Sequence, residues 1–181
     1  MPFLLLKDLP RYECLLAASK ALPDLDPSAT EVFLHLLRAG DAAVRITEAH
    51  LAEHNISQGR FTVLMLLLDK FKGCPRPDTP AGLAGRAGVT RATMTGLIDT
   101  LERDGLVKRE PDPEDRRRLS VNLTPKGQAL LQEILPGHFQ RMAALMHSLN
   151  ESERKSLVRL LNRIQEQAAT LAVVAPDVAV A

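Results

Sequence analysis

Apolar residues recur at helical spacing along the first third of the chain. Leu36 and Ala43 widen a stripe made of Phe33, Leu37, Gly40, Val44, Thr47 and Leu51. This spacing predicts a long helix that buries one face. Asp26-Pro27 predicts its start, because aspartate caps helices and proline suits the first helical position. A shorter helix is expected before it, from Leu9 to Leu22.

Three further helices are marked by residues that start and stop them. Asn55-Ile56-Ser57 interrupts the long helix, and Ser57 can cap a second helix that reaches about Phe71. A glycine and two prolines predict a loop over residues 72–78. The next two helices each have a hydroxyl residue at the start and a glycine at the end: Thr79 with Gly88, and Thr90 with Gly105.

The hydrophobic period changes after Gly105. Residues 106–109 and 119–123 predict two short strands, the second with clean alternation, joined by a polar loop. Thr124-Pro125 then starts a helix that we expect to be bent or broken at Pro136-Gly137. Asn150, with Glu153 three residues on, resembles a capping box for a last helix that ends before Pro176. The fold class is therefore mainly α with one small β-hairpin.

The third and fourth of these helices, joined by Ala87-Gly88-Val89, fit a helix-turn-helix. Apolar spacing directs Met94, Leu97, Ile98 and Leu101 into the core. The opposite face then carries small, hydroxyl and charged residues: Ala92, Thr93, Thr95, Gly96, Asp99, Thr100 and Arg103. Small residues let a helix enter a major groove, where threonines contact base edges. We expect Asp99 to pair with Arg103. The alternative is an ordinary amphipathic helix packed on another helix.

The predicted hairpin places Asp115-Arg116-Arg117-Arg118 directly after this helix. A narrow minor groove attracts inserted arginines, and Asp115 can hold the loop by pairing with one of them. The alternative is a solvated charged turn. The order of helix-turn-helix and cationic ribbon favours a winged DNA-binding motif.

Composition narrows the picture without deciding it. The net charge is only +1, so DNA contact must come from a local cationic patch. No apolar run approaches the roughly 20 residues of a membrane span. Two cysteines, Cys14 and Cys74, make no disulfide framework, and Cys14 is expected to be buried in its apolar run. The chain is expected to be cytoplasmic.

The stretch Thr90–Gly127, TRATMTGLIDTLERDGLVKREPDPEDRRRLSVNLTPKG, resembles the signature of the MarR (multiple-antibiotic-resistance regulator) family. The resemblance implies a homodimeric transcription regulator that binds a pseudo-palindromic operator in double-stranded DNA. It further implies that Asp115 shapes the wing. The DNA contacts that it implies come from Thr90, Arg91, Ala92, Thr93, Thr95, Gly96, Arg103, Arg116, Arg117 and Arg118. The regulator would be a repressor released by a small aromatic or phenolic effector, for which His35, Arg38 and Arg45 are candidate contacts.

With this resemblance the chain divides into five parts: an N-terminal extension (1–25), a dimerisation helix (26–56), the winged helix-turn-helix lobe (57–124), C-terminal dimerisation helices (125–175) and a tail (176–181). Two other functions remain open. His50, Glu53 and His54 fit the H-x-x-E-H pattern of a zinc hydrolase, and a winged helix can serve protein contacts without DNA. We expect no enzyme activity, no cofactor and no catalytic metal.

Overall fold

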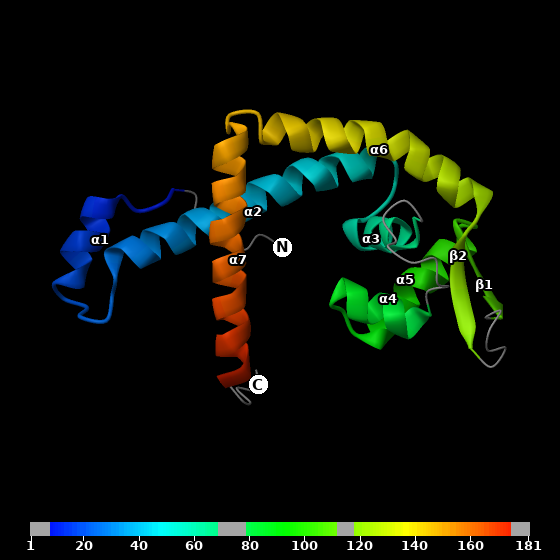
Figure 1. Cartoon of the computed structure of the whole chain (residues 1–181), viewed down its shortest axis with the longest axis horizontal. Coiled ribbons are helices and arrows are strands. Elements are labelled where there is room, and N and C mark those ends of the chain that lie inside the picture. Colours follow the sequence, from blue (N-terminus) through cyan, green and yellow to red (C-terminus); the bar gives the residue numbers. More distant parts are fainter. Residues whose placement is uncertain (1–7, 69–78, 112–117, 175–181) are drawn as a thin grey trace. The chain divides into compact units, whose positions relative to one another are not determined.

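The structure, a computed structural model, describes residues 8–68, 79–111 and 118–174 (Figure 1). The chain divides into two compact units between Phe139 and Gln140. In chain order, the helices and strands are α1 (Tyr12–Ser19), α2 (Pro27–Glu53), α3 (Gln58–Leu67), α4 (Pro80–Ala87), α5 (Arg91–Arg103), β1 (Val107–Pro111), β2 (Leu119–Leu123), α6 (Pro125–Leu145) and α7 (Glu151–Val174). The predicted class, mainly α with a small hairpin, is confirmed.

The predicted capping residues start α2, α3, α4 and α5. In each case a side-chain oxygen accepts a hydrogen bond, 3.0–3.4 Å long, from the backbone N–H three residues on: Asp26, Ser57, Thr79 and Thr90. This satisfies one of the N–H groups that a helix start leaves without a partner. Gly88 ends α4 at a φ of 66°, in the left-handed region that glycine adopts without strain.

The hydrophobic core lies where the end of α2 meets α3, α4, α5, the hairpin and the first half of α6. Its fully enclosed side chains include Leu51, Leu64, Leu83, Met94, Ile98, Leu101, Val121, Leu131 and Ile134. The inward face of α5 is the predicted one, with Leu97 half-buried beside it. The core thus fixes α5 on one side and leaves its other side exposed.

The hairpin is antiparallel, with Val107 opposite Leu123 and Arg109 opposite Val121. The first strand begins one residue later than predicted, at Val107, and ends two residues later, at Pro111. The alternation expected in β2 is wrong, because Ser120 and Val121 are both buried. Ser120 tolerates burial because its hydroxyl donates to the Glu110 carbonyl oxygen at 3.2 Å.

The start of α6 is locked to the end of α5. The Thr124 hydroxyl donates to the Gly105 carbonyl oxygen at 2.7 Å and accepts the Gly127 N–H at 3.1 Å. A Cβ on Gly127 would lie 2.1 Å from the Leu106 carbonyl oxygen. Only glycine therefore allows α6 to approach this backbone so closely, which explains why its third residue is a glycine.

Several helix boundaries differ from the prediction. The first helix spans only Tyr12–Ser19, and α3 ends at Leu67, where Leu68 turns to an extended conformation, rather than near Phe71. The helix α6 continues unbroken through Pro136. Proline has no backbone N–H, so one carbonyl in the preceding helical turn lacks its usual hydrogen bond. The remaining bonds of this 21-residue helix keep it continuous.

One burial prediction is met only in part within a single chain, and another is wrong. Most of the apolar stripe of α2 is half-buried, Phe33 and Val44 are 57% and 37% accessible, and Leu51 at its end reaches the core. Cys14 is exposed, because α1 directs Leu15 rather than Cys14 inward. An eight-residue helix buries a narrow stripe, and an apolar neighbourhood in sequence does not decide which residues lie on it.

The second unit, taken alone, contains the end of α6 and the whole of α7. The predicted capping box is confirmed: Asn150 N–H donates to Glu153 Oε2 at 2.8 Å, and Glu153 N–H donates to Asn150 Oδ1 at 3.0 Å. Exposed apolar side chains lie along α7, including Val158 and Leu171. Across the part of the chain that the structure describes, no helix is both long and apolar enough to cross a membrane.

Candidate nucleic-acid interface

The helices α4 and α5 form the predicted helix-turn-helix. The turn closes with Val89 N–H donating to the Ala84 carbonyl oxygen at 3.1 Å, an arrangement typical of a glycine-terminated helix. Because Met94, Ile98 and Leu101 are fully buried, the opposite side of α5 is directed outward. The exposed residues there are Arg91, Ala92, Thr93, Thr95, Gly96, Asp99 and Arg103.

Small residues keep the first half of this outward face flat. A Cβ added at Gly96 would meet nothing within 4 Å, so the space above it is open. Ala92 lies one helical turn before it. A partner can therefore approach the α5 backbone closely along this line.

Threonine hydroxyls on both sides of that line already donate to protein oxygens or bond to one another. Thr95 Oγ1 donates to the Arg91 carbonyl oxygen at 2.9 Å. Thr93 Oγ1 lies 2.9 Å from Thr90 Oγ1, which also caps the helix. The Thr95 oxygen therefore presents lone pairs and its methyl group outward, so it can accept a hydrogen bond from a base amino group or contact a thymine methyl.

Two arginines border a shallow depression beside this face. It has a volume of about 430 Å³ and is lined by Thr79, Pro80, Ala81, Arg91, Thr95, Arg118 and Leu119. The starts of α4, α5 and β2 meet here. Helix N-termini favour anions through their free N–H groups and dipole, so this depression, bordered by two arginines, is suited to an anion.

Arg109 on β1 joins the hairpin to α5. Its guanidinium donates to Asp99 Oδ1 and to Glu102 Oε2, each at 2.5 Å, and its backbone N–H donates to Glu102 Oε1 at 2.9 Å. Burial lowers the pKa of Arg109, but the bonds to the two carboxylates outweigh it and raise the pKa above its ordinary value. These contacts hold the wing at a fixed angle to α5.

The prediction that Asp99 pairs with Arg103 is therefore wrong, because Asp99 pairs with Arg109. Asp99 and Glu102 lie three residues apart on α5 and face β1, so the Arg109 guanidinium can bond to both carboxylates at once. Sequence reasoning missed Arg109, although two acids at this spacing followed by a cationic strand residue were a usable signal.

Of the wing residues, Arg118 is exposed and lies directly before β2. Asp115, Arg116 and Arg117 lie outside the described residues, so their roles stay predictions. The candidate effector contacts all lie on α2: His35 and Arg45 are exposed, and Arg38 is half-buried. Their contact with an effector stays a prediction.

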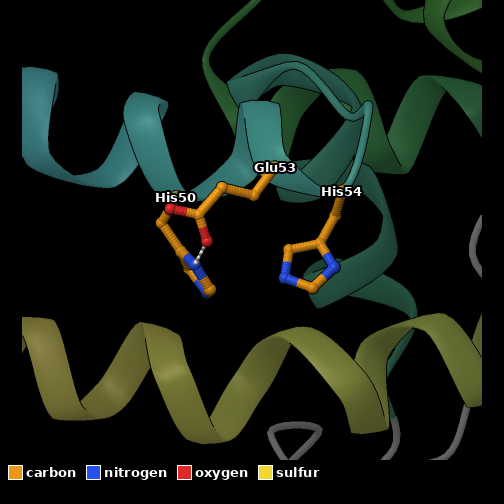
Figure 2. Close-up of side chains that lie close together, drawn as sticks. All are labelled: His50, Glu53 and His54. Carbon is orange, nitrogen blue, oxygen red and sulfur yellow. Dashed lines mark hydrogen bonds and ion pairs between the residues drawn. The ribbon is translucent and has the colours of Figure 1, made fainter.

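The third candidate set, His50, Glu53 and His54, lies together at the end of α2 (Figure 2). His50 Nδ1 is 3.3 Å from Glu53 Oε2, and its Nε2 is 3.1 Å from the Ile134 carbonyl oxygen on α6. His138, also on α6, stacks on the His50 ring. Burial, and then the charge of His50, lower the pKa of His138.

Comparisons with known proteins agree with this geometry. The MarR family model matches residues 56–119. The repressor YetL of Bacillus subtilis is 36% identical over 162 residues, covering 90% of this chain and 95% of YetL. The repressor NicR of Pseudomonas putida is 32% identical over 148 residues, covering 81% of this chain and 90% of NicR. A structure of BpsR from Bordetella bronchiseptica, concerned with regulation of its DNA binding by 6-hydroxynicotinic acid, has a TM-score of 0.62 and 29% identity, and covers 75% of this chain and 98% of BpsR.

The α4–α5 motif, the antiparallel hairpin after it and the helix that leaves the hairpin define a winged helix-turn-helix DNA-binding protein. The similarity to YetL extends over nearly the whole of both chains. This protein belongs to the MarR family of transcriptional regulators.

Proposed function

We propose that this chain is a homodimeric repressor whose α5 helix reads operator DNA in the major groove while residues 115–118 enter the adjacent minor groove. The observation that carries the proposal is the outward face of α5, where Ala92 and Gly96 leave room and Thr93 and Thr95 offer hydroxyl and methyl groups. Arg91 and Arg118 stand on one side of this face, where they can contact phosphates.

A dimer is supported by apolar surface that one chain leaves uncovered. Phe33 on α2, and Val158 and Leu171 on α7, are each more than half exposed, and exposed apolar side chains along a helix are candidates for contacts with a second chain. Two symmetric α5 helices would read half-sites about one DNA turn apart, roughly 10 bp. A stable monomer in sedimentation at micromolar concentration would contradict this assembly.

A small aromatic ligand is the proposed release signal. BpsR, whose DNA binding is regulated by 6-hydroxynicotinic acid, supports this class of effector. A ligand releases the repressor only if it binds the DNA-incompetent state more tightly, and operator DNA must then weaken ligand binding by the same factor. His35, Arg38 and Arg45 remain the candidate polar contacts.

The protein acts, in this proposal, by binding and not by catalysis. In a zinc hydrolase of the H-x-x-E-H type the glutamate must activate water. Here the Glu53 carboxylate lies against His50 Nδ1 at 3.3 Å, as a ligand or ion-pair partner does. The other alternative, a module for protein contacts alone, predicts no salt-dependent DNA binding.

Genome-wide footprinting of the purified protein tests the proposal, followed by mobility shifts on the recovered operator. Arg117→Ala should weaken binding to all sequences, since wing arginines read groove potential, whereas Thr93→Val should change the preferred base. Arg159→Ala, an exposed arginine on α7, is the control for lost charge. Equal binding by Arg117→Ala and wild type at matched salt would remove the wing from the mechanism.

A further inference from the structure

His50 faces two hydrogen-bond acceptors at once. The Ile134 carbonyl oxygen, 3.1 Å from Nε2, accepts only, and so does the ionised Glu53 carboxylate 3.3 Å from Nδ1. The ring is 3% exposed, so water does not separate these pairs. A neutral imidazole carries one N–H and leaves a lone pair opposed to an oxygen. A cation bound between Nδ1 and the carboxylate would satisfy both atoms at once.

Neighbouring groups complete a ligand set. His54 is one residue after Glu53, and its Nδ1 lies 3.2 Å from Glu133 Oε1 on α6. One ligand atom from each of His50, Glu53 and His54 lies within 4.8 Å of the others. Residues at this spacing share a helix face, and Figure 2 shows the two histidine rings extending from α2 toward α6, the faint yellow ribbon.

We propose that His50, Glu53 and His54 bind one Zn²⁺-class cation. Glu133, whose exposed side chain contacts His54, becomes the fourth ligand when its carboxylate turns toward the ion. Two imidazoles and carboxylate oxygens are ligands that Zn²⁺ accepts in a four-coordinate site. The His50 Nε2–H bond to the Ile134 carbonyl is the second-shell contact that leaves Nδ1 as the metal-binding atom. Two carboxylates balance the charge of the divalent ion, whose binding releases any proton held on Nδ1.

The site has a route to solvent and a mechanical consequence. His54 and Glu133 line a hollow of about 510 Å³, together with Arg60 and Lys126, through which an ion can enter. Three ligands come from the end of α2 and one from α6, the helix that follows the wing. The bound ion would tie these helices together, and so bias the position of the DNA-binding lobe. This regulatory consequence rests on the proposed function, whereas ion binding does not.

Metal binding is measured on the full, tag-free chain after removal of ions with EDTA. Titration with Co²⁺ should give the intense visible absorption of a four-coordinate site, and Zn²⁺ should displace it at one ion per chain. Glu53→Gln and Glu133→Gln should each weaken Zn²⁺ binding at least about tenfold. Both side chains are more than half exposed, so neither change leaves a buried group without a partner.

His147→Gln is the matched control, because His147 is exposed near the end of α6 and lies outside the cluster. It should bind Zn²⁺ as wild type does. Absence of the Co²⁺ absorption, or equal Zn²⁺ affinity in wild type and Glu53→Gln, would overturn the site.

Operator binding with and without Zn²⁺ tests the regulatory half. Wild-type affinity should change at least about fivefold, the lower end of ordinary coupling between sites, and Glu53→Gln should show no change. An ion that binds without altering operator affinity overturns the regulatory half. Failure to bind any operator overturns the proposed function, while a positive Co²⁺ result still supports the metal site.

Discussion

Replacing Gly127 by alanine tests whether the close approach of α6 to the end of α5 fixes the wing. The new Cβ would lie 2.1 Å from the Leu106 carbonyl oxygen and 3.1 Å from its carbon. Both atoms belong to the backbone, so a side-chain rotation cannot relieve the contact. The start of α6 has to move outward by about 1 Å to reach an ordinary separation.

That movement breaks bonds that the structure identifies. The Leu106 oxygen accepts from the Thr124 backbone N–H at 3.1 Å and lies 3.2 Å from the Thr124 hydroxyl. Loss of a cap costs about 0.5–2 kcal/mol, and a buried carbonyl without a partner costs about 1–3 kcal/mol. Alanine in a helix returns about 0.5–1 kcal/mol relative to glycine. The expected net loss of stability is about 0.5–4.5 kcal/mol.

Gly96→Ala is the matched control, because it makes the same change within α5 where the added Cβ meets nothing within 4 Å. It should raise stability by about 0.5–1 kcal/mol. Urea unfolding of both variants and wild type at one fixed protein concentration, needed for a dimer, gives the comparison. If Gly127→Ala proves as stable as wild type, the close approach at Leu106 does not constrain α6.

Other expected outcomes follow from single contacts. Arg109→Gln should weaken operator binding, because Asp99 and Glu102 then face DNA without their cation. The loss should shrink as salt rises, and a salt-independent loss would contradict the electrostatic reason. Arg159→Gln, which removes an exposed arginine on α7, is the control. Thr95→Val keeps the methyl group and removes the hydroxyl, so binding-site selection should show about 1–3 kcal/mol of lost discrimination at one base; an unchanged site would remove Thr95 from base reading. Asn150→Ala should destabilise α7 by about 1 kcal/mol through loss of the capping box, measured by thermal unfolding.

Helix starts and the inward face of α5 could be predicted from the sequence because each depends on residues within one or two helical turns. Thr90 caps α5 through the N–H of Thr93, three residues away, and Met94 and Ile98 are buried by the period of the same helix. The capping box at Asn150 is equally local. Such signals survive in any fold that uses the segment as a helix.

Contacts between distant segments were not predictable in the same way. The partner of Asp99 depended on the register of β1, which brings Arg109 rather than Arg103 to the carboxylate. Phe33 belongs to the apolar stripe that the helical period predicts, but no other segment that the structure describes covers it within the same chain, so it is exposed. The hydrogen bonding of the His50 ring depends on the Ile134 carbonyl oxygen, 84 residues further along the chain. The sequence supplied the chemistry at these positions, and tertiary structure decided its partners.

The small net charge is compatible with DNA binding because opposite charges occupy different parts of the motif. Arg91 and Arg118 border the depression at the N-terminal end of α5, where the helix dipole also favours anions. Asp99 and Glu102 lie toward its C-terminal end, and Arg109 pairs with both. Neutralising these acids reduces repulsion of phosphate where the second half of α5 would meet DNA. A net charge of +1 therefore describes the whole chain, whereas the local distribution decides how this motif meets a polyanion.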